Sequence, residues 1–269
     1  MALIIIAAFV LGLIVGSFLN VLILRLPARK SINGRSQCPH CKHVLSAADL
    51  VPVFSYLFLR GRCRHCGARI SPRYFYIEAA TGGLFAFCAV FFTPLDLQSA
   101  LLFLRAAFIV SVLVVVFMTD LEHFLILDKV VLPSAAALLV LNFAIDWFQK
   151  NRLQNSLSWF GILSAIGAAL FFGSIYFFSK GKWLGLGDVK FSLFLGLATP
   201  FPFIIVNLIL AYALGAIIGL ALIFFGRKKF SSRIPFGTFL ALSTIVALFY
   251  GPALVNWYAR AIGIYGIRY

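Results

Sequence analysis

Acidic residues are scarce in this 269-residue sequence. It holds eight Asp and Glu residues against 23 Lys and Arg, and charged residues make up only 12% of the chain. Soluble domains are roughly 25% charged. In addition, 62% of the residues are hydrophobic and the mean hydropathy is +1.03, which is more than a soluble core requires. The composition therefore excludes a soluble globular protein and predicts an all-α polytopic membrane protein.

The first residues also lack a positive charge. Met1-Ala2-Leu3-Ile4 is apolar from the start, and Arg25, Arg29 and Lys30 come after the first apolar run. A cleaved signal peptide has the opposite polarity. We therefore expect this run to remain as a first span with its amino end outside.

Apolar runs recur along the chain, and a transmembrane helix needs about 20 such residues. They predict eight spans, of which the sixth is the shortest. The spans lie near residues 2–24, 74–92, 100–118, 130–145, 159–178, 191–201, 203–225 and 236–258.

The basic residues indicate the orientation of these spans. Most of the 23 Lys and Arg residues lie in four segments: 25–73, 120–129, 179–190 and 226–233. The positive-inside rule places these segments in the cytoplasm and both termini outside. Because the basic residues flank spans and do not form one helix face, we expect no nucleic-acid binding.

The segment 25–73 is the one stretch long enough for a small extramembrane domain. It contains two Cys-x-x-Cys pairs, Cys38 with Cys41 and Cys63 with Cys66. Four thiolates at this spacing suit a tetrahedral Zn²⁺ ion. A histidine in place of one ligand is a minor alternative, and two disulfides are disfavoured in the cytoplasm. The sequence therefore predicts a small zinc-binding cytoplasmic loop domain.

Several acidic residues stand at the ends of apolar runs, where a carboxylate is costly to place. Asp188 follows Gly185-Leu186-Gly187, and glycines there allow unusual φ/ψ values or the close approach of another segment. Asp120, Glu122 and Asp128 share one short segment. The spacing leaves open which of these three faces Asp188.

Counting spans places Asp120 and Asp188 on one face of the membrane, together with the large basic loop. Two adjacent aspartates cannot both ionise at low cost, so one keeps a proton and the other acts as a base. Such a pair can activate a water molecule for attack on a peptide carbonyl. The simpler alternative is that each aspartate caps a helix start by accepting hydrogen bonds from free N–H groups.

Glu78 lies one turn into the second predicted span, where a carboxylate needs a partner or a function. Pairing with an arginine and a functional role are both open, and the nearby Gly82 can permit close helix packing. The remaining aspartates fall in predicted loops and are expected to be solvated: Asp49, Asp96 and Asp146.

A series of short motifs runs along most of the chain in a fixed order. It comprises Gly16-Ser17-Phe18-Leu19-Asn20-Val21, Arg25-Leu26-Pro27, both cysteine pairs, Ile70-Ser71-Pro72-Arg73-Tyr74 through Glu78, Thr119-Asp120-Leu121-Glu122, and Gly185-Leu186-Gly187-Asp188-Val189-Lys190. Together these motifs resemble the type IV prepilin peptidase family, the leader peptidases and N-methyltransferases of bacterial pilus and type II secretion systems.

The resemblance implies that Asp120 and Asp188 are the catalytic pair of a GxGD-type aspartic endopeptidase. The family cuts prepilin or pseudopilin leaders after a glycine, at the cytoplasmic face of the bacterial inner membrane. It then methylates the new amino terminus with S-adenosylmethionine. The sequence has no Rossmann-type glycine motif, so Glu78, Gly82 and the zinc loop are the candidates for that cofactor's site.

The same resemblance divides the chain into a methyltransferase-associated part, residues 1–92, and an aspartic peptidase part, residues 93–269. The rival interpretation is an ion or solute transporter with intramembrane acids and a zinc-stabilised cytoplasmic gate. Acids deep within the spans would favour it, whereas these acids lie at span ends. A noncatalytic assembly scaffold is a third possibility.

Overall fold

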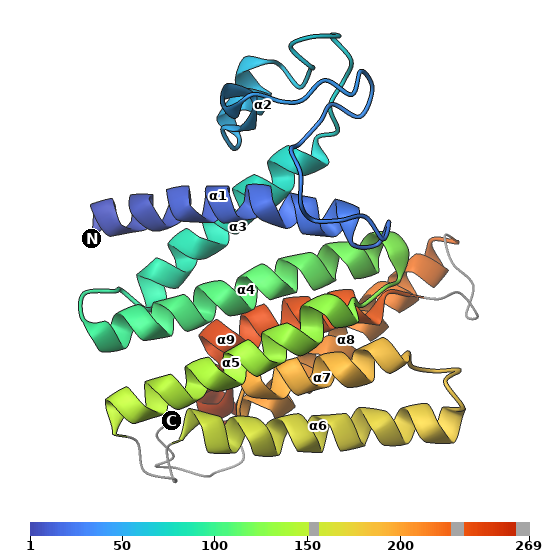
Figure 1. The fold of residues 1–269 in the computed structure, drawn as a ribbon. Coiled ribbons are helices and arrows are strands. Elements are labelled where there is room, and N and C mark those ends of the chain that lie inside the picture. Colours follow the sequence, from blue (N-terminus) through green and yellow to red (C-terminus); the bar gives the residue numbers. More distant parts are fainter. Residues whose placement is uncertain (151–155, 227–233, 262–269) are drawn as a thin grey trace. The chain divides into compact units, whose positions relative to one another are not determined.

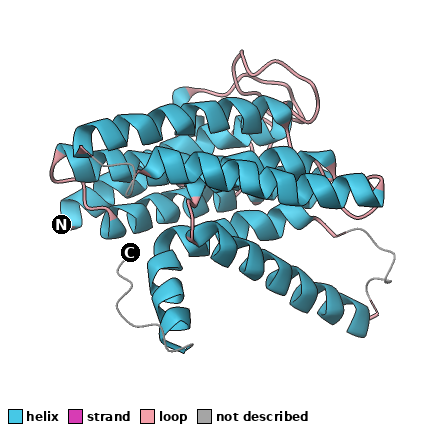
Figure 2. Ribbon diagram, turned by 90° about the horizontal axis from the view of Figure 1, so that it is seen from below, coloured by secondary structure: helices cyan, strands magenta, loops and turns pink. Residues whose placement is uncertain are grey.

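The computed structural model describes residues 1–150, 156–226 and 234–261, and these residues form helices joined by loops (Figures 1 and 2). Seven helices are long and apolar enough to cross a membrane. They are α1 (Ala2–Arg25), α3 (Arg73–Phe91), α4 (Leu97–His123), α5 (Asp128–Gln149), α6 (Leu157–Ser179), α8 (Phe203–Phe224) and α9 (Phe236–Ala261). The prediction of an all-α polytopic protein is therefore confirmed. Most of the basic segment 226–233 lies outside the described residues.

The sixth predicted span is a shorter helix, α7 (Leu186–Ala198). Its 13 residues extend about 20 Å, less than the roughly 30 Å of a bilayer core. Thr199 ends the helix just before Pro200 and Pro202, whose rings cannot continue it. Among the described residues, seven of the eight predicted spans are thus helices of spanning length, and the sixth is not.

The chain divides into two compact units, which we call unit 1 (Met1–Val115) and unit 2 (Val116–Tyr269). The boundary falls within α4. Each unit carries some of the predicted site residues.

In unit 1, α1 and α3 run antiparallel with their backbones in contact. A Cβ atom on Gly12 would lie 2.8 Å from the Cα of Gly82, and one on Gly16 would lie 2.9 Å from the Cα of Glu78. Small residues at these positions let two membrane helices approach closely. The segment between the helices, residues 26–72, forms a loop domain with a 3₁₀ helix, η1 (Ala47–Leu50), and a short helix, α2 (Phe54–Phe58).

In unit 2, α7 packs among longer helices, between α5 and α6 in Figure 1 and also against α9. Buried side-chain amides hold it there. Asn142 of α5 donates to the carbonyl of Leu197, and Asn207 of α8 donates to Thr199 and Thr244. Hydrogen bonds of this kind stabilise helix contacts in lipid. They explain how a helix too short to span is held inside the bundle.

The prediction that Asp146 is solvated is wrong. Asp146 lies near the end of α5 and accepts hydrogen bonds from the backbone N–H groups of Leu157 and Ser158, at 2.9 and 2.8 Å, and from the Ser156 hydroxyl. It therefore caps the start of α6 from the preceding helix. Asp96 is exposed, as predicted.

Candidate functional site

The two predicted catalytic aspartates are both in unit 2 and both buried. Asp120 lies in the last turn of α4 and Asp188 in the first turn of α7; they are 5% and 9% exposed. The helix starts that bind the two carboxyl groups both contact one side chain, Ile126. The prediction that both aspartates lie on one face is consistent with this arrangement.

Asp120 is held by the start of α9. Its Oδ2 accepts hydrogen bonds from the backbone N–H of Thr238 at 2.8 Å and from the Thr238 hydroxyl at 3.2 Å. A Cβ atom on Gly237 would lie 2.9 Å from the same oxygen. Free N–H groups at a helix start stabilise negative charge. Gly237 and Thr238 were not identified from the sequence, where a Gly-Thr pair at a helix start is a weak signal.

Asp188 is held by its own helix start, where its Oδ2 accepts a hydrogen bond from the N–H of Gly185 at 3.1 Å. Gly185 has ordinary extended angles, φ −80 and ψ 151, so unusual dihedrals are not the reason for this glycine. Close approach is the reason at Gly187, where a Cβ atom would lie 3.0 Å from the Cβ of Ile126.

Ile126 connects the two aspartate environments. Its Cδ1 also lies 3.0 Å from the Cβ position of Gly237, beside Asp120. One side chain therefore contacts both glycine-bearing helix starts. Tyr212 of α8 packs against Phe236, the first residue of α9, with 5.1 Å between the ring centroids. The sequence alone singled out neither residue.

The structure decides which acid faces Asp188. Asp128 forms an ion pair with Lys190, with 2.6 Å between Oδ2 and Nζ, and so joins α5 to α7. Glu122 lies beside His123, at 3.8 Å. Asp120 is thus the remaining candidate for a pair with Asp188, and both carboxyl groups also accept hydrogen bonds at helix starts. Capping alone does not require both acids to be buried, which is electrostatically costly.

The four predicted zinc ligands of unit 1 converge on one point. The sulfur atoms of Cys38, Cys41, Cys63 and Cys66 all lie within 4.8 Å of one another, and those of Cys38 and Cys66 are 3.9 Å apart. Tetrahedral Zn²⁺ with Zn–S of about 2.3 Å requires S···S distances of about 3.8 Å. The cluster is therefore compatible with zinc, whereas two separate disulfides would pair the sulfur atoms and not gather all four.

Each cysteine pair lies on a turn of the same design. The N–H of Cys38 donates to the carbonyl of His43, and the N–H of Cys63 donates to that of Ala68. Directly after the second cysteine both turns have a positive φ, +59 at Lys42 and +69 at Gly67. The backbone N–H of Cys41 lowers the pKa of the Cys38 thiol to about 6, which favours the thiolate that binds metal.

Glu78 of α3 is 8% exposed, and its carboxylate connects α3 to the loop domain through a hydrogen bond. Its Oε2 accepts a hydrogen bond from the backbone N–H of Val53 at 2.7 Å, and Ser17 of α1 is a second donor. Val53 has φ 64 and ψ −52. Positive φ is unusual for a β-branched residue and persists only where the surroundings enforce it.

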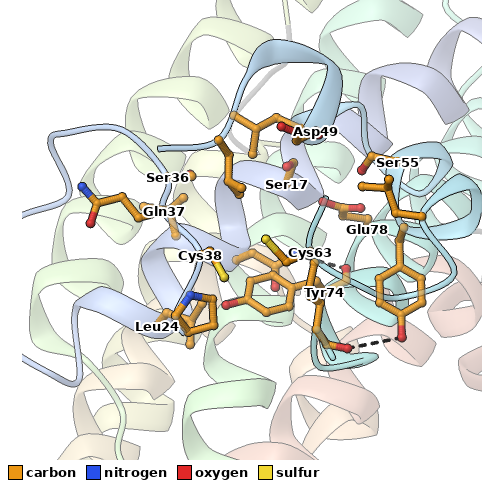
Figure 3. A pocket seen from close by; sticks show the side chains of 18 of the residues that line it. Ser17, Leu24, Ser36, Gln37, Cys38, Asp49, Ser55, Cys63, Tyr74 and Glu78 are labelled. Carbon is orange, nitrogen blue, oxygen red and sulfur yellow. Dashed lines mark hydrogen bonds between the residues drawn. The ribbon is translucent and has the colours of Figure 1, made fainter. Parts of the chain in front are cut away.

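Glu78 also lines a cavity of about 210 Å³ between α1, α3 and the loop domain. Figure 3 shows Glu78 and Ser17 at this cavity, which Cys38 and Cys63 border. Asn20 of α1 is a further lining residue and is 3% exposed. Its amide nitrogen donates to the carbonyl of Tyr74, while its buried Oδ1 has no partner among the described residues.

Asp49 lines the same cavity, so the prediction that it is solvated is wrong. Its side chain is 4% exposed and forms an ion pair with Arg64, at 2.7 Å. The hydroxyl of Ser46 and the Arg64 guanidinium lower the pKa of Asp49 to about 2.

Gly82 does not line this cavity and lies in the contact between α1 and α3, where an added Cβ atom would be 2.7 Å from Leu13.

Two family models match the chain. Residues 10–92 match the bacterial peptidase A24 N-terminal domain, and residues 107–220 match the type IV leader peptidase family. The first match contains the cysteine cluster and Glu78, and the second contains both aspartates. No solved structure matches the chain.

Several proteins named prepilin leader peptidase/N-methyltransferase are similar over most of their length. The protein of Bacillus subtilis (strain 168) is 31% identical over 256 residues, covering 94% of this chain and 96% of the relative. That of Burkholderia pseudomallei (strain 1026b) is 34% identical, covering 91% and 84%. That of Aeromonas hydrophila is 31% identical, covering 93% and 92%.

Proposed function

This chain belongs to the type IV leader peptidase family, and we propose that it is a bifunctional membrane enzyme acting on prepilins or pseudopilins. It hydrolyses the leader peptide after a glycine with the pair Asp120 and Asp188. It then methylates the new amino terminus with S-adenosylmethionine. The observation that carries the proposal is the burial of two carboxyl groups, at the end of α4 and the start of α7, beside glycines that both contact Ile126.

The pair divides the work of peptide hydrolysis. The ionised aspartate takes a proton from water as the water oxygen attacks the scissile carbonyl carbon. The protonated aspartate donates a hydrogen bond to the carbonyl oxygen, where negative charge develops. When the C–N bond breaks, the leaving nitrogen receives the proton that the first aspartate took from water. The bonds from Thr238 and Gly185 orient both carboxyl groups through Oδ2 throughout these steps.

The position of the pair suits a substrate anchored in the bilayer. Both aspartates lie at ends of helices, close to where an apolar segment leaves the membrane. Span parity and the basic loops support a cytoplasmic active site in the inner membrane. A leader that precedes a hydrophobic helix would present its scissile bond at this level.

We assign methyl transfer to residues 1–92 and hydrolysis to residues 93–269. In the first part, the cavity beside Glu78 offers a carboxylate and the unpartnered Oδ1 of Asn20. Hydrogen-bond acceptors of this kind bind an ammonium group or a sulfonium cation. S-adenosylmethionine supplies the methyl group. Glu78 holds the amine and takes its proton, so that the nitrogen lone pair is free to react.

Gly82 acts on this site indirectly, because it lets α1 approach α3 closely enough to bring Ser17 to Glu78. The four cysteines would hold a zinc ion with sulfur at all four positions, which would leave no open site for a substrate. The metal would then have a structural role and would stabilise the loop that carries Val53 and closes the cavity.

A synthetic prepilin peptide tests the peptidase assignment. In detergent-solubilised protein, we expect Asp120→Asn or Asp188→Asn to lower cleavage by about 10³-fold or more, because either change removes the acid–base pair. Mass spectrometry of the peptide gives the rate, and unchanged membrane insertion shows that the variants fold. Substantial cleavage by either variant contradicts the assignment.

The transporter alternative is not favoured. Its acids would lie deep within the spans, whereas Asp120 and Asp188 lie in terminal turns.

A further inference from the structure

The short helix α2 in the loop domain has its apolar side facing outward. Phe54, Leu57 and Phe58 are 52, 55 and 85% exposed, and their spacing places them on one face of the helix. The opposite face carries Ser55 and Tyr56, which line the cavity. In a helix on the surface of a soluble domain the apolar face would point inward.

The position of α2 along α1 is fixed by contacts within unit 1. Val53, which precedes α2, donates its N–H to Glu78, and the backbone of Glu78 packs against Gly16. Gly16 lies nine residues before Arg25, which corresponds to about 13 Å along the helix axis. The Glu78 side chain is shorter than this distance, so Val53 lies between the level of Gly16 and the level of Arg25. In Figure 1, where α1 runs across the picture, α2 is drawn above α1 and not beyond its C-terminal end.

This level falls within the membrane region. The 24 residues of α1 extend about 36 Å, slightly more than the roughly 30 Å hydrocarbon core. Arg25 ends the helix, and its guanidinium donates to the loop carbonyls of Asn33 and Ile32, at 2.8 and 3.1 Å. A segment displaced from Arg25 toward the middle of α1 is therefore at the depth reached by interfacial helices, about 5–10 Å into the headgroup and acyl boundary.

The charge of the loop domain indicates which surface it meets. Residues 26–72 contain a single acidic residue, Asp49, which is paired with Arg64. The basic residues of the same segment are Arg29, Lys30, Arg35, Lys42, Arg60, Arg62, Arg64 and Arg69. Basic residues beside an apolar face attract anionic headgroups while the apolar side chains enter the lipid.

We propose that Phe54, Leu57 and Phe58 insert into the lipid interface of the leaflet on the Arg25 side. The loop domain is then attached to the bilayer by α2 as well as by α1 and α3. The contact places the strained Val53 and the Glu78 cavity directly at the lipid surface. It does not depend on either catalytic assignment.

Tryptophan fluorescence in vesicles tests this contact. The full-length protein with Phe58→Trp is reconstituted in phosphatidylethanolamine/phosphatidylglycerol vesicles that contain acyl-chain nitroxide lipids. The signal of the wild type, which holds four tryptophans, is subtracted. The matched control is Arg35→Trp, an exposed loop position whose carbonyl is bonded to Arg25 at the end of α1. Leu57→Trp is the second reporter, and retained zinc shows that each variant is folded.

We expect the acyl-chain nitroxide to quench the Phe58→Trp and Leu57→Trp signals at least about twofold more than the Arg35→Trp signal. Equal quenching at the three positions overturns the proposal. A second measurement compares quenching by aqueous iodide before and after a prepilin peptide is added. If α2 is shielded from aqueous iodide only after this peptide is added, the face binds the substrate protein and the lipid proposal is wrong.

Discussion

The two buried carboxylate sites of this molecule are assembled by different kinds of contact. In unit 2, Asp120 and Asp188 are oriented by N–H groups at helix starts, and glycines let the helices approach. In unit 1, Glu78 is oriented by Val53, a residue of the loop that the cysteine cluster organises. Helix packing determines the first site and a metal-stabilised loop determines the second. The two activities should therefore respond to different perturbations.

Removal of zinc should have the largest effect. A chelator is expected to unfold the loop domain and abolish methylation of a mature peptide, while leader cleavage persists, because the aspartates are oriented by Thr238 and Gly185 of their own unit. Elemental analysis and the two product assays measure this. Loss of cleavage together with methylation in the zinc-free protein would show that the two sites are not separate.

Acid should release the metal in the same selective way. The pKa of Cys38 in the folded loop is about 6, below its ordinary value of 9.0. Protons compete with Zn²⁺ for all four sulfur atoms, and a bound metal lowers the pKa of its thiol ligands further. Zinc retention should therefore be complete above pH 6 and fall at lower pH, and methylation should fall with it, as followed by a metal-indicator dye. Methylation that persists after the zinc has left would contradict the structural role of the cluster.

Replacement of Glu78 should give the next largest effect. Glu78→Gln keeps the shape of the side chain but removes its charge, so we expect methylation of a mature peptide to fall about 100-fold. Cleavage of the full prepilin peptide by the same preparation is the internal control and should be unchanged. Unaltered methylation would exclude Glu78 as the residue that takes the proton.

A smaller effect is expected when the packing around Asp120 is disturbed. In Gly237→Ala the new Cβ would lie 2.9 Å from Asp120 Oδ2 and 3.0 Å from Ile126. The carboxyl group must shift, and we expect cleavage to fall about tenfold with methylation retained. Gly83→Ala is the matched control, because nothing lies within 4 Å of that Cβ position. Equal losses in both variants would point to a general effect on folding.

The smallest effect concerns the two cysteine turns. Lys42 has φ +59 where the second turn has Gly67. In Lys42→Gly the left-handed conformation stays but its cost of about 1 kcal/mol is removed, so the loop should resist urea and chelators slightly better. Unfolding of the loop domain measures this change. A less stable variant would mean that the bond from the Lys42 ammonium to the Pro39 carbonyl outweighs the backbone strain.

The sequence was sufficient for features set by local pattern. Apolar runs predicted the spanning helices, and the spacing of Cys38, Cys41, Cys63 and Cys66 predicted the cluster that the structure contains. Spacing alone could not choose between Asp120 and Asp128, which lie in one segment. The family resemblance favoured Asp120, and only packing shows that Asp128 pairs with Lys190.

Other contacts could not be predicted because they join distant segments. The bonds from Thr238 to Asp120 and from Val53 to Glu78 depend on how helices and loops pack, and no spacing rule relates those residues. For the same reason Asp49 and Asp146 were wrongly expected to be solvated. Each has its partners on another element, which the local polarity of the sequence does not reveal.

The central claim is that two independent sites act in sequence on one substrate. It is tested most directly by mixing Asp188→Asn, which should only methylate, with Glu78→Gln, which should only cleave. Given a full prepilin peptide and labelled S-adenosylmethionine, neither variant alone should yield labelled mature peptide, and the mixture should yield it. A mixture that produces cleaved peptide without label would contradict the account.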